Sequence, residues 1–154
     1  MSSNRYLVVS DLHLCDVEDH PDGWKAHKAG RFVPDEELRQ LFEKFVEEAR
    51  EGDALTLVLN GDVLDFDLVT AVPEAPPWPL RALERSFGLD ATEAKSRWKL
   101  DRVLADHETF LGALAAFAAA GHRIVYVIGN HDREVHFPAV KQGFVEAVRE
   151  AGRA

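Results

Sequence analysis

Three short apolar runs alternate with longer segments of helical periodicity along the chain. The runs span residues 6–9, 54–60 and 123–128, and each has the length of a β-strand. Nearly continuous apolar runs of this kind are typical of strands that are buried on both faces of a sheet. Because helical segments separate the runs, the pattern predicts an α/β fold, with a mainly parallel sheet flanked by helices.

Apolar residues recur at helical spacing in three further segments. The spacing predicts helices over residues 34–51, 92–120 and 137–149. The first opens with a proline followed by acidic residues, as helix N-termini often do. His107 lies within the apolar face of the second, where we expect a hydrogen-bonded histidine at the edge of the core rather than a metal ligand.

Two segments lack this periodicity. Residues 14–35 have the composition of a long loop. Residues 66–92, with four prolines and a tryptophan between positions 73 and 79, predict an insertion or cap that leaves the sheet and returns. Six basic residues accompany four acidic ones over residues 81–102. This composition indicates either a solvated helical face with charge pairs or a basic lid over an anionic or lipid-like substrate.

Composition and charge narrow the range of functions. A chain of 154 residues has a one-domain length, so we expect residues 1–154 to form a single domain. The net charge of −9 disfavours a nucleic-acid partner, although bound metal ions would still allow a phosphate substrate. The single cysteine, Cys15, excludes an intrachain disulfide and fits a reducing cytoplasm. Without a long apolar run, we expect a cytoplasmic protein that is at most peripheral to a membrane.

Polar residues with metal-binding chemistry follow each of the three predicted strands. They are Asp11 and His13 after the first strand, Asp62 and Asp65 after the second, and Asn130, His131 and Asp132 after the third. Side chains two residues apart in an extended backbone point the same way, so Asp11 and His13 could chelate Zn, Mn or Fe together. Each group alone has an ordinary explanation as a turn or helix cap. Because parallel strands end at one edge of a sheet, however, we expect all three groups to share one cleft.

The three groups also resemble a known set of motifs. Asp-x-His, Gly-Asp-x-x-Asp and Gly-Asn-His-Asp, in this order after strands, are similar to the motifs of the calcineurin-like metallophosphoesterase family, over residues 6–132. The resemblance implies an αββα sandwich and a hydrolase with two divalent metal ions, Mn, Fe or Zn. It further implies cleavage of phosphomonoester, phosphodiester or pyrophosphate bonds by in-line attack of a metal-bridging hydroxide. The expected substrate is a phosphorylated small molecule or a lipid-linked compound. The Ser-Asp-Leu-His-Leu opening resembles the family's pyrophosphohydrolase of UDP-diacylglucosamine, and the cap would suit a lipid-linked diphosphate.

The resemblance assigns a role to each motif residue. The implied metal ligands are Asp11 and His13 at the first metal, Asp62 between both metals, and Asn130 at the second. The implied catalytic residues are His131, which stabilises or protonates the leaving oxygen, Asp132, which orients His131, and Asp65, which supports the site without binding metal. A bridging carboxylate suits this chemistry because it partly neutralises two dications held about 3.5–4 Å apart.

The chain departs from the family pattern after Asp132. A further histidine and a Gly-His-x-His motif, which complete both metal shells in the family, are missing from the last 22 residues, where His136 is the only histidine. No sequence remains for the second sheet either. We therefore expect an N-terminal fragment of such an enzyme, with an uncovered sheet face that offers a route to self-association. A non-catalytic scaffold and an inactive fragment are the alternatives.

Overall fold

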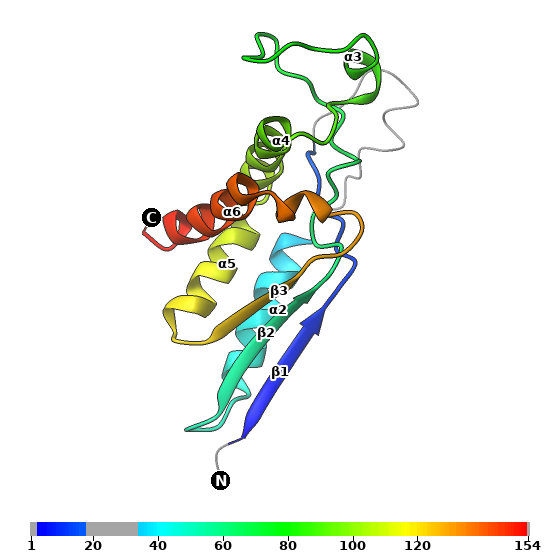
Figure 1. Cartoon of the computed structure of the whole chain (residues 1–154). Coiled ribbons are helices and arrows are strands. Elements are labelled where there is room, and N and C mark those ends of the chain that lie inside the picture. Colours follow the sequence, from blue (N-terminus) through cyan, green and yellow to red (C-terminus); the bar gives the residue numbers. More distant parts are fainter. Residues whose placement is uncertain (1–2, 18–33, 154) are drawn as a thin grey trace.

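A computed structural model describes residues 3–17 and 34–153, so most of the predicted loop over residues 14–35 lies outside the described residues. Its strands form one parallel sheet in the order β1, β2, β3 (Figure 1). β1 spans Asn4–Val9, β2 spans Ala54–Asn60 and β3 spans Arg123–Val127. The prediction of an α/β fold with a parallel sheet is therefore confirmed.

Helices α2 and α5 lie against one face of this sheet (Figure 1). α2 (Asp35–Glu47) packs against α5 (Glu108–Ala119), while α6 (Pro138–Ala151) packs against both α5 and α4 (Glu93–Asp106). The hydrophobic core fills the space between the helices and the inner face of the sheet, where Leu57 is fully buried. The core thus fixes the strands from one side only.

The other face of the sheet is open in the described part of the chain. Tyr6 and Val8 on β1 are 62% and 57% exposed, and Val127 on β3 is 43% exposed. Leu57 and Leu59, on the opposite face of β2, are completely buried. The prediction that the strands are buried on both faces is therefore wrong for the described residues, because helices cover one face alone. Self-association through the open face stays a prediction.

The predicted helix over residues 92–120 is interrupted at His107, where α4 ends and α5 begins. The buried imidazole lies 2.6 Å from Oδ1 of Asp35 through Nδ1 and 2.9 Å from the carbonyl oxygen of Cys15 through Nε2. Asp35 also accepts a hydrogen bond from the backbone N–H of Phe110. The histidine is thus hydrogen-bonded, as expected. These contacts accompany a break between α4 and α5, although the apolar residues continue at helical spacing across it.

Residues 66–92, the segment predicted as a cap, are largely irregular and lie beyond the carboxyl ends of the strands, with one helical turn, α3 (Glu84–Phe87) (Figure 1). The basic residues that follow are not all solvated. Lys95 is buried and donates to Glu84, and Lys99 is buried and donates to the carbonyl oxygen of Phe66 at 3.0 Å. Burial lowers the pKa of Lys99. A solvated charged face therefore does not describe this part of α4.

Candidate metal centre

Backbone hydrogen bonds continue past the strand ends and draw the three motif segments together. The N–H of Asp11 donates to the carbonyl of Gly61 at 3.1 Å, and the N–H of His13 donates to the carbonyl of Asp62 at 2.9 Å. The N–H of Gly61 donates to Val127 at the end of β3, also at 2.9 Å. The parallel register thus delivers the polar residues to one edge of the sheet, as the sequence predicts.

Three residues of this edge have unusual backbone conformations. Asp11, His13 and Asp62 have φ angles of 54°, 47° and 51°, and they are the non-glycine residues with positive φ in the described chain. Such a conformation costs about 1–3 kcal/mol for a residue with a side chain, and it persists where the surroundings enforce it. The strained positions coincide with three of the predicted metal ligands, which points to a functional constraint at this edge.

Gly129 allows the second and third motifs to approach each other closely. A Cβ atom at this position would lie 2.3 Å from Oδ1 of Asp62 and 2.5 Å from its backbone nitrogen. The same Oδ1 accepts a hydrogen bond from the backbone N–H of His131 at 2.8 Å. The glycine before Asn130 is therefore required by packing, because any side chain would displace the carboxylate of Asp62.

The side chains gathered here have the chemistry of a divalent-metal site. Asp11, His13 and Asp62 each offer one ligand atom, and these atoms lie within 4.8 Å of one another. Two carboxylate oxygens and one imidazole nitrogen suit Mn, Fe or Zn. Asn130 is exposed on the segment after β3, next in sequence to His131, whose backbone N–H donates to Asp62. The residues present therefore fit a divalent cation.

Asp65 lies behind the two site histidines and is itself 3% exposed. Its Oδ2 lies 2.9 Å from Nδ1 of His13 and 3.2 Å from Nδ1 of His131, the second contact falling outside hydrogen-bond geometry. Its Oδ1 accepts hydrogen bonds from the backbone N–H groups of Asp67 and Leu68. A carboxylate at Nδ1 leaves Nε2 of His13 available for a metal, which is the usual arrangement of metal-binding histidines.

Asp132 differs from the expectation that it orients His131. Its buried carboxylate accepts hydrogen bonds from the N–H of Val63 at 3.0 Å, from the hydroxyl of Tyr126 at 2.8 Å and from the N–H of Gly129. Burial and the charge of Asp132 raise the pKa of Tyr126. Asp132 thus joins the segments after β2 and β3, and the carboxylate next to the His131 ring is that of Asp65.

Two supporting residues were missed by the sequence analysis. Tyr126 is one, and its position on the inward-facing side of β3 was the available signal, since a buried hydroxyl needs a partner. Lys99 is the other: it holds the carbonyl of Phe66, whose N–H donates to the carbonyl of His131 at 3.3 Å. Nothing in the helical periodicity of α4 distinguishes Lys99 from a solvated lysine.

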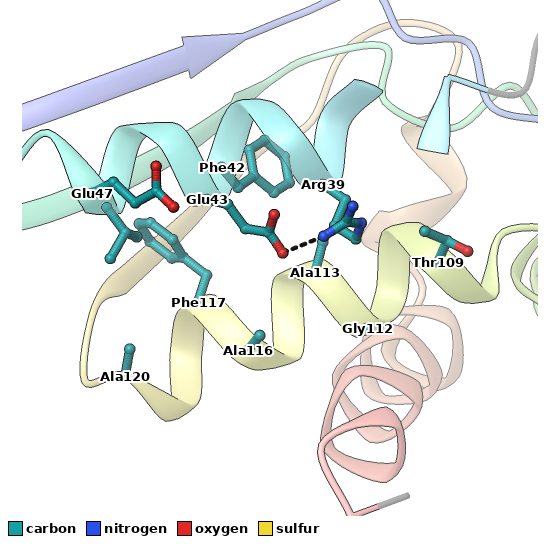
Figure 2. A pocket seen from close by; sticks show the side chains of 11 residues that line it. Arg39, Phe42, Glu43, Glu47, Thr109, Gly112, Ala113, Ala116, Phe117 and Ala120 are labelled. Atoms are coloured by element: carbon teal, nitrogen blue, oxygen red, sulfur yellow. Dashed lines mark hydrogen bonds and ion pairs between the residues drawn. The ribbon is translucent and has the colours of Figure 1, made fainter. Parts of the chain in front are cut away.

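A cavity of about 460 Å³ lies elsewhere, between α2 and α5 (Figure 2). Its lining residues include Phe42 and Phe117 and the ion pair of Arg39 with Glu43. None of its lining residues is a candidate metal ligand. The candidate site is therefore the edge of the sheet and not this cavity.

The fold and the site define an α/β protein with a candidate divalent-metal site at the carboxyl ends of parallel strands. The family profile described as calcineurin-like phosphoesterase matches residues 4–151, so the chain belongs to the calcineurin-like phosphoesterase family. This match confirms the resemblance inferred from the motifs. Members of the family are metal-dependent hydrolases of phosphoesters. Comparisons with curated proteins and with solved structures gave no match. Within the described ranges, no helix is both long and apolar enough to cross a bilayer.

Proposed function

We propose that this chain hydrolyses phosphomonoester, phosphodiester or diphosphate bonds at two divalent cations. Asp11 and His13 would hold the first cation, Asn130 the second, and Asp62 would lie between them. The observation that carries the proposal is the meeting of Asp11, His13 and Asp62 in left-handed backbone conformations, with ligand atoms within 4.8 Å. Bound cations supply positive charge that polarises a phosphoryl group and activates water.

The protein's own contribution is to hold the ligands and a proton-transfer group. Asp65 keeps the Nδ1 atom of His13 engaged at 2.9 Å, which fixes the ring with Nε2 directed away from this carboxylate. His131 also has its Nδ1 toward Asp65, 3.2 Å from Oδ2. Its Nε2 is therefore the nitrogen that would donate a proton to, or stabilise, the leaving oxygen. In this proposal Asp65 serves both histidines.

The position of the cap supports a lipid-linked substrate among the candidate phosphorylated compounds. Residues 66–92 lie beyond the carboxyl ends of the strands, at the same end of the sheet as the ligands (Figure 1). The alternative is a non-catalytic scaffold, which the open sheet face would favour. Against it, Asp62 and His131 are both present and in mutual contact, at 2.8 Å between Oδ1 and the backbone nitrogen.

Hydrolysis of bis-p-nitrophenyl phosphate and of p-nitrophenyl phosphate in Mn²⁺ tests the proposal. Replacing His131 with Asn should lower kcat about 10²–10⁴-fold, the usual contribution of a positioned proton donor. His136→Asn is the matched control, because His136 is exposed on η1 (Arg133–His136), close to the site in sequence. Turnover that survives undiminished in His131→Asn would contradict the role of His131 as proton donor. Absence of turnover in the native chain with every metal and ester would favour the scaffold.

A further inference from the structure

The short helix α3 presents its apolar residues to the outside and its carboxylate to the inside. Leu83 and Phe87, four positions apart, are 69% and 59% exposed. Residues with this spacing share one side of a helical turn. Glu84, between them in the sequence, is only 4% exposed. The turn thus buries its carboxylate and exposes its large apolar side chains, together with Arg85.

The inward side of α3 is held by a network around Glu84. Its Oε1 accepts hydrogen bonds from the N–H of Asp90 at 2.9 Å and from Nζ of Lys95 at 2.6 Å. Its Oε2 accepts one from the N–H of Arg81 at 2.6 Å. The Asp90 N–H, Lys95 and the Arg81 N–H together lower the pKa of Glu84 to about 2. These bonds fix the turn so that Leu83 stays outward without any partner bound.

Two arginines flank the exposed apolar side chains. Between residues 75 and 89 the only acidic residue is Glu84, and the basic residues are Arg81 and Arg85. Both arginines are exposed, and the Arg81 side chain is 80% exposed although its Nη1 lies 3.3 Å from Oδ2 of Asp90. An ion pair that is so exposed to water contributes little to stability, so Arg81 can exchange Asp90 for another anion. The cap tip, defined as Arg81, Leu83, Arg85 and Phe87, is therefore apolar and cationic on a chain of net charge −9.

We propose that the cap tip docks on an anionic lipid surface, with Leu83 and Phe87 at the acyl boundary and the two arginines at lipid phosphates. Large apolar side chains next to basic ones are the combination that binds peripheral proteins to anionic bilayers. A symmetric dimer through this patch would gather the two arginines of both copies in one small interface, where their like charges repel, which disfavours a second copy as the occupant. The positive charge of the cap tip thus favours an anionic lipid surface over a second copy of the chain.

Docking in this way would turn the metal centre toward the bilayer. The cap and the ligand residues lie at the same end of the sheet, beyond the carboxyl ends of the strands (Figure 1). Such an orientation suits the lipid-linked substrate proposed above, and this consequence rests on the proposed function. Lipid binding itself does not depend on the proposed function, because vesicle binding is measured without turnover.

Co-sedimentation with vesicles tests the proposal. The chain should bind vesicles that contain phosphatidylglycerol and bind phosphatidylcholine vesicles weakly. The double variant Leu83→Ser/Phe87→Ser should lower the partition coefficient by about tenfold or more, since it removes both apolar anchors. Arg81→Gln/Arg85→Gln should lower it by about fivefold for each arginine and weaken its dependence on salt. The matched control is Leu41→Ser on α2, where Leu41 is 39% exposed away from the cap, and its binding should equal that of the native chain.

Several results would overturn the proposal. They are no binding of the native chain to anionic vesicles, undiminished binding of the Leu83→Ser/Phe87→Ser variant, and an equal loss in Leu41→Ser. Sedimentation velocity without lipid tests whether a second copy of the chain occupies the cap tip instead. A concentration-dependent dimer that Leu83→Ser/Phe87→Ser abolishes would assign the cap tip to a dimer interface. Circular dichroism of each variant confirms the native fold, and the arginine variant provides an independent reading if the serine variant unfolds.

Discussion

Replacing Asp132 with alanine should destabilise the protein strongly, because its carboxylate connects two motif segments from a fully buried position. The substitution leaves three donors without their acceptor: the N–H groups of Val63 and Gly129 and the hydroxyl of Tyr126. A buried donor that loses its partner costs about 1–3 kcal/mol. With partial entry of water, we expect the free energy of unfolding to fall by about 3–6 kcal/mol.

A loss of this size is measurable by urea unfolding, since single domains unfold with about 5–15 kcal/mol in total. Tyr126→Phe is the graded companion, because it removes one donor and leaves Asp132 with its two backbone N–H groups. We expect it to cost about 1–2 kcal/mol. The double variant should cost less than the sum of the two single variants, because both remove the same Tyr126–Asp132 hydrogen bond.

A further variant, Asp132→Asn, distinguishes this structural role of Asp132 from the orienting role that the family resemblance implies. If Asp132 instead oriented the His131 ring, Asp132→Asn would change the pH dependence of kcat while leaving stability almost intact. A loss of less than about 1 kcal/mol in Asp132→Ala would refute the reasoning from buried hydrogen bonds. An additive double variant would show that Tyr126 and Asp132 do not act through their shared bond.

Three further predictions concern packing, acid stability and the core. Gly129→Ala should abolish Mn²⁺ binding in a calorimetric titration, because its Cβ would lie 2.3 Å from Oδ1 of Asp62, whereas Gly112→Ala, with open space around its Cβ, should bind as the native chain does. Since folding lowers the pKa of Glu84 from 4.5 to about 2, its contribution to stability is present above pH 4.5 and is lost as the pH falls toward 2; Glu84→Gln should remove this part of the pH dependence of urea unfolding. Phe110→Ala should lower the free energy of unfolding by about 3–5 kcal/mol in the same assay, since Phe110 is completely buried.

The sequence predicts the sheet and the meeting of its polar residues because both depend on local patterns. The apolar run over residues 54–60 marks a strand, and in a parallel sheet the residues after each strand must lie at one edge. That geometry brings Asp11, His13 and Asp62 together without any knowledge of their side-chain contacts. Roles that follow from a residue's position relative to a strand can therefore be predicted before the structure is known.

Contacts between distant segments are not accessible in this way. The interruption at His107 depends on Asp35 and Cys15, which are 72 and 92 residues away, while the periodicity across the interruption is that of one helix. One partner of Asp132 is similarly distant, because Val63 follows β2 and lies 69 residues away in the sequence. The apolar runs by themselves do not show that one face of the sheet is open, because an apolar run has the same composition whether one or both faces are covered.

Metal stoichiometry is the most direct test of the central claim, that the carboxyl edge of the sheet binds divalent cations. Equilibrium dialysis against Mn²⁺, followed by elemental analysis, should find bound metal in the native chain and none in Asp62→Ala. Asp67→Ala is the matched control, because Asp67 follows on the same segment with a side chain that is 55% exposed, and it should retain the metal. Equal metal content in the native chain and in Asp62→Ala, or none in either, would contradict the account.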